Sequence, residues 1–245
     1  MKKPKMIIFD CGHTLLGGRD FNPLRGGETL FNYIKHNRNA LTPKQVDNFS
    51  ANLFKRIRPV HELNFELHEW QFQRFLYEYL EIELSISWAE AEKIFWDSTY
   101  PSIPMPDVDK VIDFINSIDI RSGVISNVCF SGSALSEKIN RLLPHNKFEF
   151  IITSSEYMFR KPEPMIFELA LKKAINLNAE DVWFCGDSIK EDIEGASNVG
   201  FFPVWYENTT IENVLNKQDK KITPNCEYLH IHRWDEFIKI LMNLK

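Results

Sequence analysis

Hydrophobic residues in this chain of 245 residues follow two patterns that alternate along much of its length. Short apolar runs without strict polar alternation predict strands that are buried on both faces. These runs cover residues 5–10, 121–127, 148–155, 181–187 and 201–207. Segments with a helical repeat of apolar positions lie between them, at residues 106–118, 131–143, 164–177 and 190–200. Alternating strands and helices predict an α/β fold, a doubly wound parallel sheet with helices on both faces.

Residues 17–103 interrupt this alternation. The stretch shows no strand pattern, and its amphipathic helical segments cover residues 27–37, 42–57, 66–80 and 87–100. It begins at Gly17 and Gly18 and ends in the proline-rich segment 100–106, and both features favour a domain boundary. We therefore expect residues 1–16 and 104–245 to form the α/β core, and residues 17–103 to form an inserted, all-helical domain whose aromatic residues pack a core of its own.

Composition and charge exclude several classes of protein. The net charge is −5, and the 29 basic and 34 acidic residues are well mixed, so the basic stripe needed to bind nucleic acid is missing. No apolar run approaches the roughly 18 residues of a membrane-spanning helix, and the N-terminus lacks a signal-peptide pattern. The four cysteines show neither C-x-x-C spacing nor disulfide-scaffold density. We expect a cytoplasmic protein with no nucleic-acid or membrane partner; the pattern leaves its oligomeric state undetermined.

Polar residues gather where the predicted strands end. In an open parallel sheet, ligands bind beyond the carboxyl ends of the strands, so side chains at these ends are expected to converge. The first strand ends at Asp10, the second ends at Ser126 and Asn127, the third leads to Lys161, and the fourth ends at Asp187 with Asp192 following. Each residue alone fits a turn, a helix cap or a surface charge. The set at successive strand ends is harder to explain in that way.

These residue types suit phosphoryl transfer. A carboxylate can attack phosphorus and form an aspartyl phosphate, which divides one difficult displacement into two easier ones. Clustered carboxylates repel one another unless a cation lies among them, and oxygen ligands favour a hard ion such as Mg²⁺. A lysine and the ion would neutralise charge on the transferred group, while a serine hydroxyl and backbone N–H groups would bind its oxygens.

The motifs "FDCGHTLL", "VISN", "RKPEPMIF" and "CGDSIKEDIEGASNVGF", in this order, resemble the four motifs of the haloacid dehalogenase (HAD) superfamily of hydrolases. The insert directly after the first motif resembles its C1-type helical cap, and the core would then be a three-layer Rossmann-like domain. The resemblance implies a Mg²⁺-dependent phosphatase or phosphotransferase that acts on a small phosphorylated metabolite.

The resemblance also implies roles for individual residues. It makes Asp10 the nucleophile, Lys161 the charge that stabilises the phosphoryl group, and Ser126 with Asn127 the phosphate-binding site. The implied Mg²⁺ ligands are Asp10, Asp187 and the backbone carbonyl of Gly12, and the implied supporting residues are Thr14, Ser188 and Asp192.

Gly12 departs from the phosphatase pattern. Phosphatases of this family typically carry a second Asp at this position, which protonates the leaving oxygen and later activates water. Glycine keeps the backbone carbonyl but removes the acid–base group, whose help is typically worth about 10² to 10⁴ in rate. One interpretation is a phosphatase whose substrate has a good leaving group, or whose proton shuttle is His13 or a residue of the insert. His13 titrates in a suitable range, but it also fits a purely structural loop position.

Two further interpretations of Gly12 stay open. One is a haloacid dehalogenase, which also lacks the second Asp, although such enzymes work without metal and lack the acidic fourth motif present here. A phosphonate hydrolase is a related possibility, since it carries a small residue at this position and a cap lysine that forms a Schiff base. The lysines of the insert available for that role include Lys35, Lys44, Lys55 and Lys93. The other interpretation is a regulatory protein that binds metal and phosphate without turnover, although the retained Asp10 favours an enzyme.

Substrate choice is expected to depend on the insert, since the strand ends supply only the reacting groups. A basic cluster, Lys55, Arg56, Arg58 and His61, would suit a second anionic group of a substrate, although such clusters more often form a solvated helix face. Strand alternation is expected to turn Cys11 and Cys185 away from the neighbouring carboxylates and into the packed layers.

Overall fold

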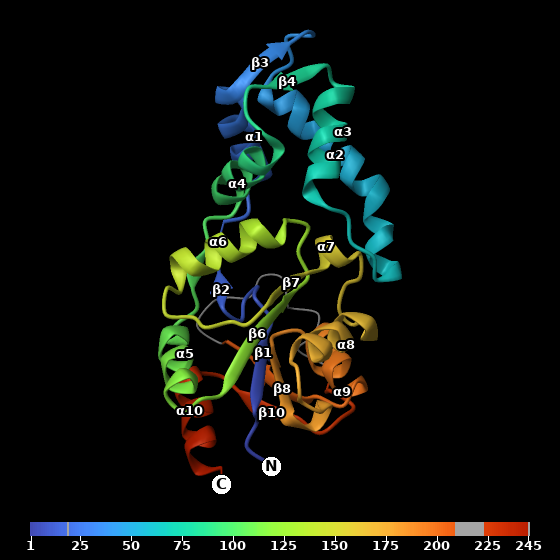
Figure 1. The fold of residues 1–245 in the computed structure, drawn as a ribbon. Helices are drawn as coiled ribbons and strands as arrows, with labels where there is room; N and C mark the ends of the chain where they lie inside the picture. The colour runs from blue at the N-terminus through green and yellow to red at the C-terminus, as the bar shows by residue number, and fades with distance from the viewer. Residues whose placement is uncertain (19, 209–222, 245) are drawn as a thin grey trace.

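The computed structural model of this chain describes residues 1–18, 20–208 and 223–244. Within these residues, a central sheet of parallel strands has the order β10–β9–β8–β1–β6–β7 (Figure 1). The strands are β1 (Met6–Phe9), β6 (Arg121–Ser126), β7 (Ile151–Thr153), β8 (Val182–Gly186), β9 (Phe202–Tyr206) and β10 (Leu229–Ile231). The predicted doubly wound parallel α/β fold is therefore confirmed.

Strand β10 was not predicted from the sequence. It pairs with β9 at the edge of the sheet, where Leu229–Ile231 lie opposite Val204–Tyr206. Of its three residues, Ile231 alone is fully buried, and His230 is exposed. An edge strand this short lacks the continuous apolar run by which the other strands were recognised.

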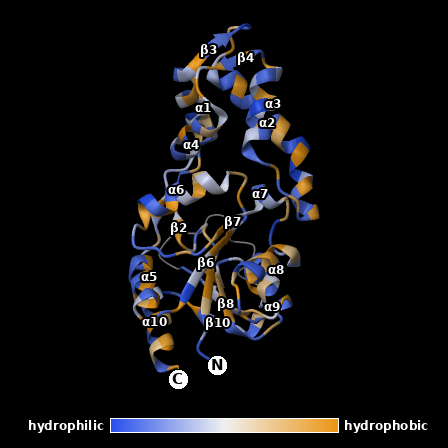
Figure 2. Ribbon diagram, viewed as in Figure 1, coloured by the Kyte–Doolittle hydropathy of each residue, from blue (hydrophilic) through white to orange (hydrophobic). Residues whose placement is uncertain are grey.

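Helices cover both faces of the sheet and make a three-layer core (Figures 1 and 2). Ile7 and Phe9 face one layer and Met6 and Ile8 face the other, as strand alternation requires. The first layer contains α5 (Val108–Ser117), α6 (Gly132–Leu142) and α10 (Trp234–Asn243). The second contains α8 (Pro164–Lys173) and α9 (Gly195–Asn198). Shorter elements join the strands to these helices: α7 (Ser154–Tyr157), the 3₁₀ turn η3 (Ala179–Asp181) and the π-helical turn η4 (Ile189–Glu194).

The insert packs a small hydrophobic core of its own, which includes Leu30, Val46, Leu76 and Ala91. Its helices are α1 (Pro23–Leu30), α2 (Pro43–Ile57), α3 (Glu69–Tyr79) and α4 (Trp88–Thr99), with 3₁₀ turns η1 (Phe31–Tyr33) and η2 (Arg58–Leu63). Capping boxes at Thr42 and Ser87 fix where α2 and α4 begin. Among the described helices, none is both long and apolar enough to cross a membrane.

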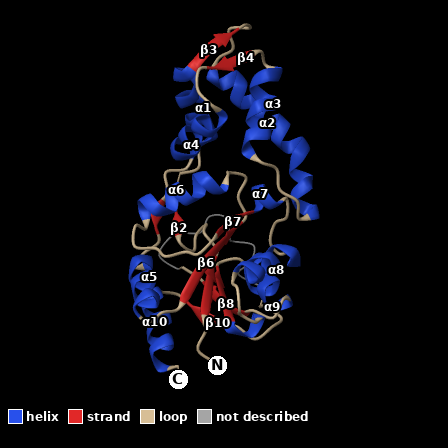
Figure 3. Ribbon diagram, in the orientation of Figure 1, coloured by secondary structure: helices blue, strands red, loops and turns tan. Residues whose placement is uncertain are grey.

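The expectation that the insert is all-helical was wrong at its tip (Figure 3). β3 (Ile34–Asn37) and β4 (Ile82–Leu84) pair there as a two-stranded antiparallel sheet. The predicted helix over residues 27–37 continues only to Leu30 and the short 3₁₀ turn that follows. Pairing with a segment far along the chain outweighs the weak local helical pattern, and no local repeat reveals such a partner.

The two connections between core and insert lie side by side. β2 (Leu16–Gly17) and β5 (Ile103–Pro104) pair antiparallel, with Leu16 opposite Pro104 and Gly17 opposite Ile103. The insert therefore leaves and rejoins the core at one place, above the carboxyl end of β1 (Figure 1).

Candidate active site

The centre of the sheet places Asp10 between two other strand ends. β1 lies between β6 and β8, with Phe9 opposite both Val124 and Cys185. The Asp10 backbone N–H donates to the carbonyl oxygen of Cys185 at 2.8 Å. Asp10 is 6% exposed and Ser126, which ends β6, is 5% exposed. The order of the strands thus brings the predicted nucleophile beside the predicted phosphate-binding serine.

Lys161 joins two of the predicted acidic residues. Its Nζ donates to Oδ1 of Asp10 and to Oδ1 of Asp192, each at 2.6 Å, and the side chain is buried. Burial by itself lowers the pKa of the Lys161 ammonium, but the charges of Asp10 and Asp192 outweigh burial, and the net shift of the pKa is upward. Lys161 therefore stays protonated and holds a fixed positive charge in the site.

Positive charge near Asp10 determines whether its carboxyl group is ionised. Burial raises the pKa of Asp10 to about 7; Lys161 opposes this rise, and Asp192 adds to it. A nucleophilic carboxylate must be ionised, so one lysine shared between two carboxylates leaves the site short of positive charge at neutral pH. A divalent cation beside Asp10 would supply that charge.

Three carboxylates lie close enough to share such an ion. One oxygen of each of Asp10, Asp187 and Asp192 lies within 4.8 Å of the other two. Both oxygens of Asp192 already accept hydrogen bonds, from Lys161 Nζ and, at 3.0 Å, from the Ser188 N–H. Asp192 therefore already positions the lysine and the loop. An all-oxygen donor set suits Mg²⁺.

The loop after β8 is closely packed around Asp192. A Cβ atom at Gly186 would lie 2.3 Å from Asp192 Cγ, so only glycine allows this carboxylate so near the strand end. Ser188 caps the N-terminus of the π-helical turn η4, since its Oγ accepts from the Glu191 N–H at 3.3 Å. Ser188 therefore supports the loop through both its backbone and its side chain.

The side chain of Asn127 binds the backbone of Lys161. Its Nδ2 donates to the Lys161 carbonyl oxygen at 2.9 Å and to Glu191 Oε2 at 3.0 Å, and its Oδ1 accepts from the Lys161 N–H at 2.8 Å. The amide ties the loops after β6 and β7 together. Glu191 was missed in the sequence analysis, because an acidic residue in a helical turn has no feature that separates it from a surface charge.

The turn after β1 holds Gly12, His13 and Thr14. Gly12 is exposed, and a Cβ atom built there would have no atom within 4 Å. His13 adopts a left-handed backbone (φ 57°), and burial lowers the pKa of its imidazole. Within the described residues, His13 Nδ1 and Thr14 Oγ1 are buried without a hydrogen-bond partner. The turn is held by its backbone, since the Leu15 and Leu16 N–H groups both donate to the Cys11 carbonyl oxygen at 2.9 Å.

Cys11 and Cys185 both pack in the core layer that contains α5 and α10, as strand alternation predicted. Burial raises the pKa of both thiols, so neither provides a thiolate near neutral pH.

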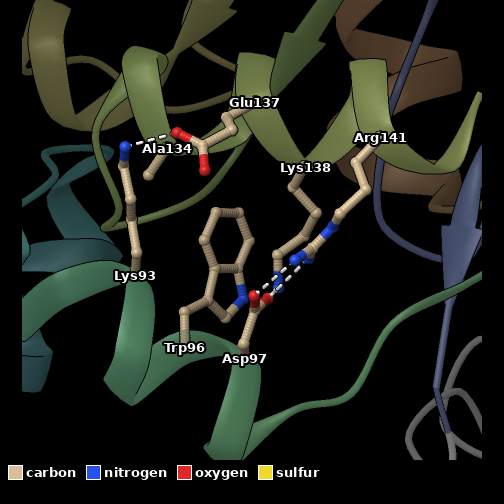
Figure 4. A pocket seen from close by; sticks show the side chains of 7 residues that line it. All are labelled: Lys93, Trp96, Asp97, Ala134, Glu137, Lys138 and Arg141. Atoms are coloured by element: carbon tan, nitrogen blue, oxygen red, sulfur yellow. Dashed lines mark hydrogen bonds and ion pairs between the residues drawn. The ribbon is translucent and has the colours of Figure 1, made fainter. Parts of the chain in front are cut away.

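One contact region between insert and core, the α4–α6 seam, is formed by α4, α6 and the loop before α6 (Figure 4). Asp97 accepts from Arg141 at 2.9 and 3.0 Å and lies 2.8 Å from Lys138 Nζ. Trp96 stacks on Phe130 with ring centroids 4.2 Å apart, and Lys138 Nζ lies 4.0 Å from the centroid of the Trp96 ring. The buried Glu92 of α4 accepts from Ser131 Oγ and from Trp70 Nε1, each at 2.7 Å.

A second contact region, the Glu66 seam, lies beside Lys161. The side chain of Glu66 is 1% exposed; it accepts from Ser154 Oγ at 2.9 Å and pairs with Arg160. The Glu66 N–H donates to the Met158 carbonyl oxygen at 2.6 Å, and the Arg160 N–H donates to the Asn64 carbonyl oxygen at 2.8 Å. The insert therefore contacts the loop that carries Lys161 as well as the loop that follows Ser126.

The basic residues of the insert mostly face solvent. Three of its lysines make exposed ion pairs: Lys35 with Glu83, Lys44 with Asp47 and Lys93 with Glu137. Lys55, Arg56 and Arg58 are exposed at the end of α2 and the start of η2, and His61 Nε2 lies 2.9 Å from Glu66 Oε1. A lysine that forms a Schiff base is usually desolvated, and these lysines are not.

Sequence comparison relates this chain to known hydrolases. The sequence model of a family described as "Haloacid dehalogenase-like hydrolase" matches residues 61–205. The "Glyceraldehyde 3-phosphate phosphatase" of Pyrococcus abyssi (strain GE5 / Orsay) is 30% identical over 207 residues, covering 83% of this chain and 81% of that protein.

Solved structures share the fold over the whole chain. An HAD phosphatase from Thermococcus onnurineus matches with a TM-score of 0.62 at 18% identity, covering 100% of this chain and 99% of that one. A 2-haloacid dehalogenase from Pseudomonas syringae pv. Tomato DC3000 matches with a TM-score of 0.64 at 20% identity, covering 99% of each chain. At these identities the likeness shows the fold alone, since one fold serves many reactions.

Proposed function

Since this chain belongs to the haloacid dehalogenase-like hydrolases, we propose that it is a Mg²⁺-dependent phosphatase that works through an aspartyl phosphate on Asp10. The curated relatives support a phosphatase that acts on a small phosphorylated metabolite. The observation that carries the proposal is the contact of Lys161 Nζ with Asp10 and Asp192, with Asp187 beside them.

Each residue has a distinct task in this proposal. Asp10 attacks phosphorus as the P–O ester bond of the substrate breaks, and the leaving oxygen takes up a proton. Water then attacks the aspartyl phosphate and loses a proton, which releases phosphate and restores the Asp10 carboxylate. Lys161 stabilises the negative charge on the transferred phosphoryl oxygens, and the Ser126 hydroxyl donates to one of them. Asp10, Asp187 and the Gly12 carbonyl would hold Mg²⁺, which supplies charge stabilisation when bound.

We propose that residues 17–103 are a cap that covers the substrate and excludes water during reaction. The Glu66 seam and the α4–α6 seam connect the insert to the loops that carry Lys161 and follow Ser126. A three-carbon phosphate such as glyceraldehyde 3-phosphate is the first substrate to test, since it appears in the names of several relatives.

Phosphate release by the purified full chain tests the proposal. With Mg²⁺ present, we expect release from glyceraldehyde 3-phosphate or another member of a panel of small phosphorylated metabolites, and from p-nitrophenyl phosphate. Asp10→Asn removes the nucleophile with little change of shape, so turnover should fall by about 10³-fold or more. The matched control is Asp109→Asn, which makes the same change at an exposed position of α5 and should leave turnover unchanged.

Other outcomes would favour the alternatives. Halide release from 2-chloro acids without metal would indicate a dehalogenase. Tight binding of Mg²⁺ and phosphate without turnover, unchanged in Asp10→Asn, would indicate a regulatory protein. Phosphate release that survives Asp10→Asn would contradict the covalent route.

A further inference from the structure

A second cluster of metal-binding side chains lies at the edge of the sheet, apart from Asp10. Glu207 follows β9, and His230 and His232 belong to β10 and the residue after it. One ligand-type atom of each residue lies within 4.8 Å of the other two. In the strand order β1–β8–β9–β10, this cluster lies two to three strands from Asp10, or about 10 to 15 Å at the usual strand spacing.

The backbone brings these three side chains together. His230 lies on β10 and His232 follows its last residue, and the two imidazole rings lie side by side with centroids 4.5 Å apart. β9 and β10 are parallel neighbours with Trp205 opposite His230, and the Glu207 N–H donates to the Ile231 carbonyl oxygen at 2.9 Å. Glu207 therefore lies beside the two histidines as a consequence of the register, not of a flexible loop.

The distances between the three side chains suit a shared ion. Glu207 Oε2 lies 3.1 Å from His230 Nε2 and 3.7 Å from His232 Nδ1, and the two imidazole centroids are 4.5 Å apart. Two ligands bound tetrahedrally to Zn²⁺ lie about 3.3 Å from each other, because each bond is about 2.0 Å long. His232 Nδ1 also lies 3.2 Å from the Glu207 carbonyl oxygen, so a bound ion would replace that hydrogen bond.

Stacking on Trp205 holds the His230 imidazole in place. His230 stacks on Trp205, with centroids 4.1 Å apart and an interplanar angle of 5°. Trp205 Nε1 donates to the Asp187 carbonyl oxygen at 3.2 Å, which fixes the indole in turn.

The nearby cation Arg233 is paired with Asp235 and Glu236, so its charge is compensated. The side chains of the cluster are about one third to one half exposed, which leaves an ion access from solvent.

We propose that Glu207, His230 and His232 form a binding site for a divalent transition-metal ion, with Zn²⁺ as the ion to test. Two imidazoles and one carboxylate favour Zn²⁺ and related ions over Mg²⁺, and three protein ligands leave a coordination position for water or another group. The site is independent of the proposed phosphatase chemistry. Its link to the catalytic loop runs from His230 through Trp205 to the backbone of Asp187.

Cobalt absorption tests the site, because Co²⁺ replaces Zn²⁺ and gives visible bands that report its ligands. The full chain without a histidine tag is titrated with Co²⁺ in the presence of excess Mg²⁺, which fills the carboxylates around Asp10. We expect one equivalent of Co²⁺ to bind with the intense bands of low-coordinate nitrogen and oxygen ligation, and Zn²⁺ to displace it. His230→Ala and His232→Ala should each weaken binding by about 10²-fold or more.

Two variants distinguish this site from metal binding elsewhere on the protein. His145→Ala removes a more exposed histidine that pairs with Asp113 at 3.2 Å, and it should leave Co²⁺ binding unchanged. Asp187→Asn should also leave it unchanged. The proposal is overturned if Co²⁺ binding survives loss of both His230 and His232, if Asp187→Asn abolishes it, or if the unaltered protein binds less than one equivalent. Failure of phosphate release would leave this result unaffected, so the two proposals can fail separately.

Discussion

At the scale of single residues, the site is defined by what surrounds each side chain. Asp10 and Lys161 were predicted from their motifs, and the structure adds that they are in direct contact and buried. Gly12 was predicted to lack the acid–base group, and the structure adds that the space beyond its Cα is open. Asn127 was predicted as part of the phosphate-binding site, and the structure adds that its amide binds the backbone of Lys161 and the side chain of Glu191.

The open space beside Gly12 makes Gly12→Asp a sharp test of the missing carboxylate. The backbone there is not left-handed and a Cβ meets no atom, so the variant should fold normally. An acid–base group matters most for a poor leaving group, so we expect turnover of alkyl phosphates to rise by about 10²-fold and formation of the aspartyl phosphate from p-nitrophenyl phosphate to change little. Steady-state kcat/KM on both substrates, which reports the steps up to departure of the leaving group, provides the measurement.

A pre-steady-state experiment checks the same residue. In the unaltered protein, water attack lacks its base, so p-nitrophenyl phosphate should give a burst of nitrophenolate followed by a slow phase. Gly12→Asp should speed the slow phase and remove the burst. Gly12→Asn is the control, since it has the same shape without a titratable group. Equal effects of Asp and Asn, or no effect of either, would show that another group already serves this step.

At the scale of elements, α3, α4 and the segment before α3 place three buried carboxylates of the insert against the core. Glu69 and Glu92 lie on these helices, and Glu66 precedes α3. Glu66 has a cationic partner in Arg160, while Glu92 accepts hydrogen bonds from neutral donors. Glu69 accepts from Gln73 Nε2 at 3.0 Å and also contacts the Cys129 thiol. The periodicity of α3 predicted a helix, but not that a glutamate occupies its buried face.

Glu69 predicts a pH dependence of stability. Burial raises its pKa from 4.5 to about 7, hydrogen bonds from Cys129 and Gln73 oppose the rise, and the charges of Glu92 and Glu66 add to it. The folded protein therefore binds a proton that the unfolded chain has lost. This contribution to stability is fully present below about pH 4.5 and is lost as the pH rises to about 7.

Glu69→Gln should therefore stabilise the protein at pH 8 by up to about 3 kcal/mol and change its stability little at pH 4.5. Urea unfolding at a series of pH values measures the difference. Glu78→Gln is the control on the same helix, where the carboxylate is exposed and paired with Arg74. If both variants show the same pH profile as the unaltered protein, Glu69 is already ionised in the folded state at neutral pH.

At the scale of the whole molecule, the insert rests on the core along the two seams, which differ in burial. In the α4–α6 seam, Arg141 and Asp97 are 55% and 41% exposed, whereas in the Glu66 seam Arg160 and Glu66 are 17% and 1% exposed. Exposed ion pairs contribute little to the free energy of unfolding, whereas a buried carboxylate that loses its cationic partner lowers it strongly. The Glu66 seam is therefore the firmer electrostatic attachment of the insert.

Two arginine variants compare these seams. Among the described residues, Arg160→Ala leaves the buried Glu66 with His61, Ser154 and a backbone N–H as partners, so we expect the free energy of unfolding to fall by about 3 kcal/mol. Arg141→Ala leaves Asp97 with Lys138, so the loss should be about 1 kcal/mol or less. Denaturant unfolding at one pH provides both values. A larger loss for Arg141→Ala would mean that the α4–α6 seam dominates the attachment.

The sequence by itself determined the main parallel sheet, the approximate bounds of most helices and the identity of the residues at the strand ends. This information is local, because apolar periodicity and turn residues act over a few neighbouring positions. Only the tertiary structure decided that Lys161 bridges Asp10 and Asp192, that β3 pairs with β4, that Asn127 binds Glu191, and that Glu207 meets His230 and His232. Each of these contacts joins residues far apart in the chain, and their meeting depends on strand order and register, which no local pattern records.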